Sequence, residues 1–104
     1  MDYKVIVSDQ AEQDLNNIYS YIYNELKSKA SAERVASQLH RAMVELSMMP
    51  KRFRVYPLEP WFSRGIRSVP VGNYMLFFLV KDVNAEVWIT RIVYGKRDMT
   101  GVLR

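Results

Sequence analysis

One apolar run limits the possible folds of this 104-residue chain more than any other feature. Residues Tyr74–Lys81 are nearly all apolar, with Gly72-Asn73 before them and Asp82 after them as turn residues. The run is far shorter than the roughly 18 residues that a membrane-spanning helix needs, and it fits a central strand covered on both faces. The rest of the chain must therefore supply elements that cover a sheet.

Three further segments have the composition of strands. Residues 2–7 are short and β-prone. Residues 66–71 contain Pro70, which has no backbone N–H and so favours an edge strand or a bulge. Glu86–Tyr94 is rich in Val and Ile, follows a turn at 82–85 and ends at Gly95. Short turns between the last three strands predict an antiparallel meander, and the first strand is expected to join the same sheet.

Between the first strand and the meander, apolar residues repeat at helical spacing. Ser8-Asp9 offers an N-cap for a first helix of about five turns, and Ser31 offers an N-cap for a second helix that ends near Pro50. The first apolar stripe consists of Ala11, Leu15, Ile18, Ile22 and Leu26. The second consists of Ala32, Val35, Ala36, Leu39, Met43 and Leu46. Two such helices with a short connection predict an antiparallel hairpin.

The loop at residues 50–64 has three prolines and no clear period, and we expect it to be ordered because Trp61 and Phe62 need burial. The predicted fold class is α+β: a strand, a helix hairpin and a three-stranded antiparallel meander, with the helices packed on one face of a four-stranded sheet. The length leaves room for one domain, residues 1–104.

Composition excludes several kinds of site. The chain has no cysteine and a single histidine, His40, so neither a disulfide nor a transition-metal site is expected. No phosphate-binding glycine loop or nucleophile elbow occurs, and we expect no cofactor. With no apolar run of membrane length and no signal peptide in the first residues, the sequence predicts a cytoplasmic protein without membrane contact.

Charge is distributed unevenly along the chain. Residues 1–50 carry five Lys or Arg and seven Asp or Glu, a balance of −2, whereas residues 51–104 carry ten and four, a balance of +6. The basic half indicates either a surface for an anionic partner or a solvated basic face.

The basic residues around the predicted sheet are the candidates for target binding. They are Arg64, Arg67, Arg91, Lys96 and Arg97. Guanidinium groups can pair with phosphates, and Tyr74 and Tyr94 could stack on bases; the alternative is that Tyr74 is a core residue and the arginines only solubilise the sheet. Because Arg67 opens its strand while Arg97 follows the end of another, we expect a surface rather than a pocket.

Motifs along the whole chain resemble those of one protein family. The matching segments are Tyr3-Lys4-Val5, Asp14-Leu15, Gly65-Ile66-Arg67, Val71-Gly72-Asn73-Tyr74 and, most specifically, the ending from Arg91 to Asp98. In this order and spacing they are similar to the RelE/ParE superfamily, the toxins of type II toxin–antitoxin systems. The resemblance implies the α+β fold, growth arrest when the toxin is free of its cognate antitoxin, and a role of the kind known as plasmid stabilisation.

The resemblance leaves the target open between DNA gyrase, the target of ParE-like members, and the ribosome with its mRNA, the target of RelE-like endoribonucleases. The nucleases usually place an arginine where this chain has Met75, and a tyrosine in the tail where this chain has Val102-Leu103, although Arg97 matches. These departures favour gyrase. If the protein is a nuclease, its catalytic candidates are Arg67, Arg97 and Tyr94.

A third hypothesis is a basic RNA-binding module without toxicity. For the antitoxin, the sequence suggests that an amphipathic acidic segment docks beside the basic surface, where Met75, Phe77 and Phe62 supply apolar contacts.

Overall fold

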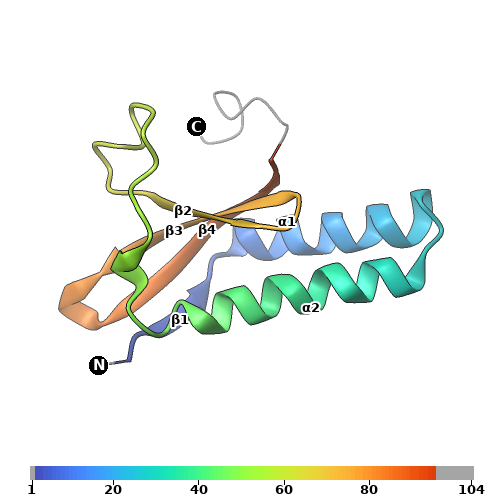
Figure 1. Ribbon diagram of the computed structural model, residues 1–104, viewed down its shortest axis with the longest axis horizontal. Helices are drawn as coiled ribbons and strands as arrows, with labels where there is room; N and C mark the ends of the chain where they lie inside the picture. The colour runs from blue at the N-terminus through green and yellow to red at the C-terminus, as the bar shows by residue number, and fades with distance from the viewer. Residues whose placement is uncertain (1, 96–104) are drawn as a thin grey trace.

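The computed structural model describes residues 2–95, and these form two helices packed against one face of a four-stranded mixed sheet (Figure 1). The elements in chain order are β1 (Lys4–Val7), α1 (Asp9–Ser20), a π-helical turn η1 (Tyr21–Glu25), α2 (Lys29–Glu45), a 3-10 turn η2 (Pro50–Arg52), β2 (Arg67–Val71), β3 (Tyr74–Lys81), a 3-10 turn η3 (Asp82–Asn84) and β4 (Glu86–Tyr94). The predicted fold class is confirmed.

The sheet has the strand order β1-β4-β3-β2. The meander β2-β3-β4 is antiparallel as predicted, and β2, which carries Pro70, lies at the edge. The first strand joins the sheet by pairing with β4 in parallel, and it is shorter than the predicted 2–7 because Asp2 forms only an isolated bridge with Met48.

Helix starts and ends differ from the predictions at two points. The first N-cap lies at Ser8-Asp9 as predicted, and Ser8 is the cap, because its side chain accepts a hydrogen bond from the N–H of Ala11. The second cap is Ser28 and not Ser31: Ser28 has extended backbone and its Oγ accepts from the N–H of Ser31, so α2 begins at Lys29. The predicted first helix of five turns ends as an α-helix at Ser20 and continues as η1.

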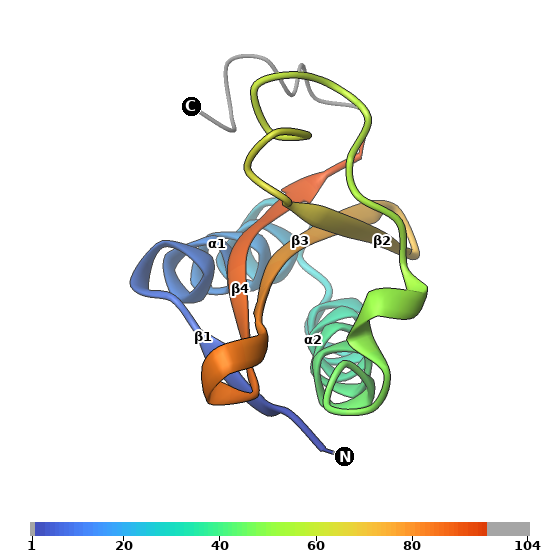
Figure 2. The same cartoon turned by 90° about the vertical axis from the view of Figure 1, so that its left-hand side faces the viewer.

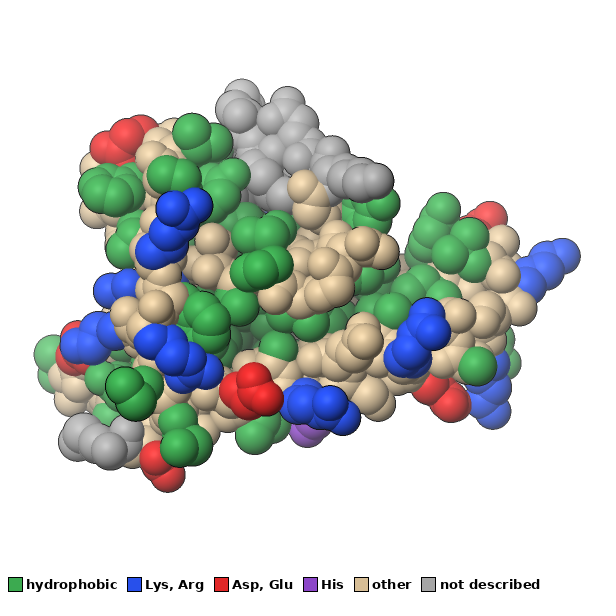
Figure 3. Space-filling view, in the orientation of Figure 1, with side chains coloured by type: hydrophobic (Ala, Val, Ile, Leu, Met, Phe, Trp, Pro, Cys, Tyr) green, Lys and Arg blue, Asp and Glu red, His purple; other side chains and the backbone are tan. Residues whose placement is uncertain are grey.

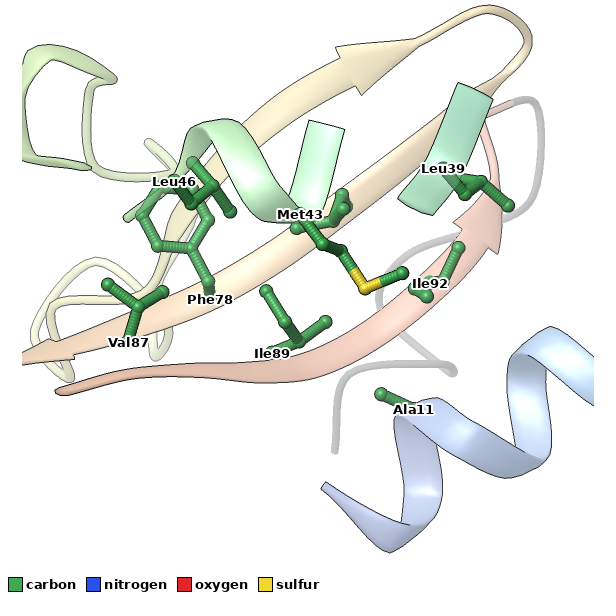
Figure 4. Close-up of a cluster of buried hydrophobic side chains, with 9 residues drawn as sticks. Ala11, Leu39, Met43, Leu46, Phe78, Val87, Ile89 and Ile92 are labelled. Atoms are coloured by element: carbon green, nitrogen blue, oxygen red, sulfur yellow. The ribbon is translucent and has the colours of Figure 1, made fainter. Parts of the chain in front are cut away.

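The main core lies between the sheet and the helices (Figure 4). It brings Leu39, Met43 and Leu46 of α2 against Phe78 of β3 and Ile89 of β4, all of them buried. These are residues of the second predicted stripe and of the two apolar strands, so the hydrophobic pattern fixes this packing.

A second, smaller core covers the opposite face of the sheet. The 53–66 loop lies there, on the side away from the helices (Figures 1 and 2), and packs Trp61 against Phe77 and Val93. The loop is therefore ordered, and Trp61 is buried as predicted. The prediction was wrong for Phe62, whose side chain is 54% exposed.

No helix formed by residues 2–95 combines the length and the apolar character needed to cross a bilayer.

Candidate functional site

An open groove of about 770 Å³ lies between the helix hairpin and the end of the sheet. Its walls are Ile18, Tyr21, Ile22, Leu26 and Val35 of the hairpin, and Asn73, Tyr74, Ile92, Val93 and Tyr94 of the sheet, with Asp14, Asn17, Ser31 and Arg34 completing the lining. Figure 3 shows apolar side chains along the hollow between the projecting tip of the hairpin and the sheet. The groove is thus mainly apolar with one cationic side chain, Arg34.

The groove exists because the hairpin is longer than the part of the sheet that it covers. α1, η1 and α2 run past the turn between β2 and β3, so their far ends have no strand beneath them (Figure 1). Apolar side chains near the tip of the hairpin consequently stay in solvent: Leu26, the last residue of the first stripe, is 58% exposed, and Tyr21 is 56% exposed. Exposed apolar groups gathered in one concavity are typical of a protein-binding surface.

Two tyrosines form the sheet wall of the groove. Tyr74 and Tyr94 are partners in the β3–β4 register, and their rings meet edge to face with centroids 5.8 Å apart. Burial raises the pKa of Tyr74 above its ordinary value of 10.0, and the neighbouring Tyr94 and Tyr21 raise it further, so the hydroxyl stays neutral at physiological pH. Tyr94 is 40% exposed.

Asp14, one of the residues that line the groove, forms an ion pair with Arg91. Nε of Arg91 is 2.8 Å from Oδ2 of Asp14, and Nη2 is 3.1 Å from Oδ1. The same carboxylate accepts a hydrogen bond from the backbone N–H of Ile92 at 2.9 Å. Arg91, a predicted target-binding residue, is therefore held by the protein itself.

Arg67 is likewise held by the protein, elsewhere on the sheet. Its Nη1 donates to the carbonyl of Phe53 at 2.6 Å, which fastens the start of the 53–66 loop to β2. Arg67 of β2 is paired with Phe78 of β3, and Arg91 of β4 is paired with Phe77 of β3. Because successive residues of a strand face opposite sides of the sheet, the two arginines face opposite sides. The structure does not bring these two arginines together.

The remaining predicted site residues are dispersed. Arg64 is exposed in the 53–66 loop, and Tyr94 lines the groove. Lys96 and Arg97 lie outside the described residues. Of the residues predicted to receive the antitoxin, Phe62 is exposed, but Phe77 is fully buried under Tyr56 and Trp61, so a docking role for Phe77 was wrong.

Sequence reasoning missed the two features that shape the groove: the role of Asp14 and the exposure of the hairpin tip. The signal for the first was a carboxylate inside the apolar stripe of α1, three residues after Ala11 and one before Leu15. Within residues 2–95 no cluster of three or more His, Cys, Asp or Glu side chains could hold a metal ion.

Comparison with known proteins identifies relatives of this fold. A family model described as the ParE toxin of the type II toxin–antitoxin system parDE matches residues 5–99. None of the curated protein sequences compared with the chain matches it.

Several solved structures share the architecture. The chromosomal ParDE system of P. aeruginosa aligns with a TM-score of 0.72 and 21% identity, over 88% of this chain and 95% of the other. The RelBE2 toxin–antitoxin complex of Mycobacterium tuberculosis aligns with a TM-score of 0.68 and 20% identity, over 90% and 92%. The archaeal RelE–RelB complex of Pyrococcus horikoshii aligns with a TM-score of 0.61 and 18% identity, over 94% and 100%. At these identities the similarity shows the fold.

Proposed function

Because the chain belongs to the ParE toxin family of type II toxin–antitoxin systems, within the RelE/ParE superfamily, we propose that it is a single-domain cytoplasmic toxin that arrests growth by inhibiting DNA gyrase. In this proposal the toxin acts without chemistry of its own, by binding its target. A cognate antitoxin holds it inactive until the antitoxin is lost.

We choose gyrase over the ribosome because of the apolar environment of Met75. Met75 packs with Trp61, Phe77 and Val93 in the apolar cluster under the 53–66 loop. Cleavage of RNA needs cationic or polar groups placed around the reacting phosphate, and an apolar cluster cannot stabilise that charge. Arg67 and Arg91 make hydrogen bonds within the protein instead. This chemistry favours binding over catalysis.

The groove between the hairpin and the sheet is the proposed seat of the antitoxin. Its apolar lining fits one face of an amphipathic helix, and Arg34 at its wall fits a carboxylate of that helix. This replaces the site expected from the sequence, because Phe77 is buried while Tyr21, Leu26 and Tyr94 are exposed.

A supercoiling assay with purified gyrase and toxin freed of antitoxin tests the target. We expect relaxed plasmid to stay relaxed as toxin is added, and added antitoxin to restore supercoiling. Toeprinting on translating ribosomes is the parallel assay. Reproducible cuts in mRNA at the ribosomal A site that disappear in Arg97→Ala would contradict the gyrase proposal and establish the endoribonuclease.

Co-expression tests the partner. A small open reading frame beside the toxin gene should encode a protein that co-purifies with it as a stable complex. The variant Leu26→Asp, which places a charge in the groove, should release that protein. Separate elution of the two wild-type proteins at low salt would refute the pairing.

A further inference from the structure

The face of the sheet away from the helices carries an apolar row that the 53–66 loop does not bury. In the strand register Ile6 of β1 pairs with Trp88 of β4, and Trp88 pairs with Leu79 of β3. Cross-strand partners share a face of the sheet, so the three side chains form one continuous row. Each is partly exposed.

A charged row runs beside the apolar one on the same face. Lys4, Glu86 and Lys81 are partners across β1, β4 and β3, two residues from the apolar row along each strand. We call the six residues of the two rows the Trp88 platform. The loop cluster of Trp61, Phe77 and Val93 covers another part of this face, which leaves the platform outside that small core.

The indole of Trp88 is held in place by the charged row. The Nζ of Lys81 lies 4.8 Å from the centroid of the Trp88 ring, a cation–π contact, and the indole N–H donates to the carboxylate of Glu86 at 3.1 Å. A tryptophan fixed in this way loses little side-chain entropy when it binds a partner, which is a property of interface hot spots.

The platform carries a positive charge. Two exposed lysines, Lys4 and Lys81, outnumber the single carboxylate of Glu86, so the net charge of the platform is positive. Gly65 of the 53–66 loop lies beside the platform, since a Cβ on it would be 3.9 Å from a methyl group of Leu79, and the preceding residue, Arg64, is exposed. An apolar centre with a cationic rim is complementary to an acidic protein surface that presents an apolar contact.

We propose that the Trp88 platform is the surface with which this toxin binds its target, and that its partner is an acidic patch with an apolar centre on a protein. This inference rests on the proposed function, which supplies the protein target, and it adds the place on the toxin where that target binds. Lys81 covers one face of the indole, so stacking of a nucleic-acid base on that face would have to displace it. The geometry therefore favours a protein over a nucleic acid.

The platform and the antitoxin groove share none of their residues. The groove is lined by the hairpin and by the ends of β3 and β4 near Tyr74 and Tyr94, whereas the platform occupies the other end of β4, near Glu86 and Trp88, and the opposite face of the sheet from the helices. A substitution in the platform should therefore affect target binding and leave antitoxin binding intact.

Two platform variants and one matched control test the proposal. Trp88→Ala removes the anchor, and Lys81→Glu reverses an exposed charge without altering the core. Arg41→Glu makes the same reversal on the exposed side of α2, away from the platform. Growth arrest on induction is the first readout because it requires no knowledge of the target. The half-inhibitory concentration in the gyrase assay is the second, and the dissociation constant of the antitoxin complex checks the fold.

We expect Trp88→Ala and Lys81→Glu to abolish growth arrest and to raise the half-inhibitory concentration about tenfold or more, as hot-spot substitutions do, while the antitoxin still binds within about twofold of wild type. Arg41→Glu should behave as wild type in all three measurements.

If both platform variants bind antitoxin and still arrest growth, the platform is not the target surface. If they lose growth arrest while wild-type toxin leaves gyrase active, the platform stands and the gyrase proposal falls. Tight binding of single-stranded RNA that Trp88→Ala abolishes would overturn the protein partner.

Discussion

At the scale of the residue, Asp14 shows how one side chain completes the sheet. The parallel pairing of β1 with β4 ends at Val7 and Ile89, and the N-terminal part of α1 then takes the place of β1 beside β4. Asp14 accepts the N–H of Ile92 that a longer β1 would have bonded, and its charge is neutralised by Arg91. The amino-acid sequence alone could not reveal this role of Asp14, because the role depends on the residue at which β1 ends.

Asp14→Ala should lower the free energy of unfolding by about 2–3 kcal/mol, because it leaves a buried N–H unsatisfied and removes the carboxylate from Arg91. The loss stays below that of a fully buried pair, since the Arg91 side chain is 24% exposed and water can partly replace the carboxylate. Urea unfolding followed by circular dichroism measures it. Glu12→Ala, which removes an exposed carboxylate from the same helix, is the control and should cost less than about 0.5 kcal/mol. Equal losses in the two variants would contradict the role of Asp14.

Arg97→Ala should keep the melting temperature within a few degrees and weaken growth arrest, as we predict from its place after Gly95 in the basic end of the sequence. An exposed arginine costs under about 0.5 kcal/mol of stability when replaced, whereas one that contacts an anionic partner costs about 1.5–3 kcal/mol of binding. Thermal unfolding and growth curves on induction separate the two quantities. A variant that is stable and fully toxic would show that Arg97 does not contribute to growth arrest.

At the scale of the element, the strands were predictable because an apolar run between two turns marks where each long strand begins and ends. Tyr74–Lys81 and Glu86–Tyr94 begin and end as predicted, since turn residues bound both runs. The helix ends were less predictable, because Ser28 and Ser31 are equally good caps in sequence and tertiary packing selects one. The π-helical turn at Tyr21–Glu25 also left no signal, because the apolar stripe through Ile22 continues as in an α-helix.

The two serines at the start of α2 provide a direct test of the cap. Ser28→Ala should lower the free energy of unfolding by about 1 kcal/mol, because the N–H of Ser31 then loses its acceptor. Ser31→Ala keeps that N–H and its bond to Ser28, and it should cost less than about 0.5 kcal/mol. Chemical denaturation of both variants gives the comparison. A larger loss in Ser31→Ala would restore the cap expected from the sequence.

A polar contact between three side chains, Tyr3, Lys51 and Asp82, should make the stability of the fold depend on pH in the acid range. Tyr3 donates a hydrogen bond to Asp82 at 2.7 Å, and Lys51 lies 3.1 Å from the same carboxylate. The bond from Tyr3, followed by the one from Lys51, holds the pKa of Asp82 below its ordinary value of 3.8. A carboxyl group with a lower pKa in the folded state stabilises the fold at pH values above its unfolded-state pKa. This stabilisation is lost as the pH falls through the folded-state pKa.

The melting temperature of wild type should therefore exceed that of Asp82→Asn at pH 7, and the difference should shrink as the pH falls below 3.8. The difference is expected to be small, because all three side chains meet at the protein surface. Thermal scans of both proteins over a pH series measure it. A difference that stays constant down to pH 2 would show that the carboxylate charge is not what stabilises this contact.

At the scale of the whole molecule, the sequence predicted the layers but not the surfaces. The order of elements and the apolar stripes determine that helices cover one face of the sheet, and the fold follows. The two surfaces that we propose to be functional depend on how far each layer extends. The hairpin outruns the sheet and opens the groove, and the 53–66 loop covers only part of the other face, so that Trp88 stays outside the small core. The charge pattern located neither surface, because Arg67 and Arg91 bind within the protein.

If the groove binds the antitoxin and the platform binds the target, the two activities should separate by mutation in the groove as well. Arg34→Glu places a negative charge where we expect a carboxylate of the antitoxin. Such a like-charge contact should weaken the antitoxin complex about tenfold or more, mainly through faster dissociation. Arg34 is exposed on α2 and far from Trp88 in the fold, so gyrase inhibition by the free toxin should stay within about twofold of wild type.

The matched control is Lys29→Glu, another exposed cation of α2 that does not line the groove. It should leave both antitoxin affinity and gyrase inhibition unchanged. Surface plasmon resonance with immobilised antitoxin gives the dissociation rates, and the supercoiling assay gives the inhibition. In cells, Arg34→Glu should arrest growth even when antitoxin is co-expressed at a level that protects against wild type, because less toxin is bound at the same concentrations. If Arg34→Glu instead loses gyrase inhibition and keeps the antitoxin, the two surfaces have been assigned the wrong way round.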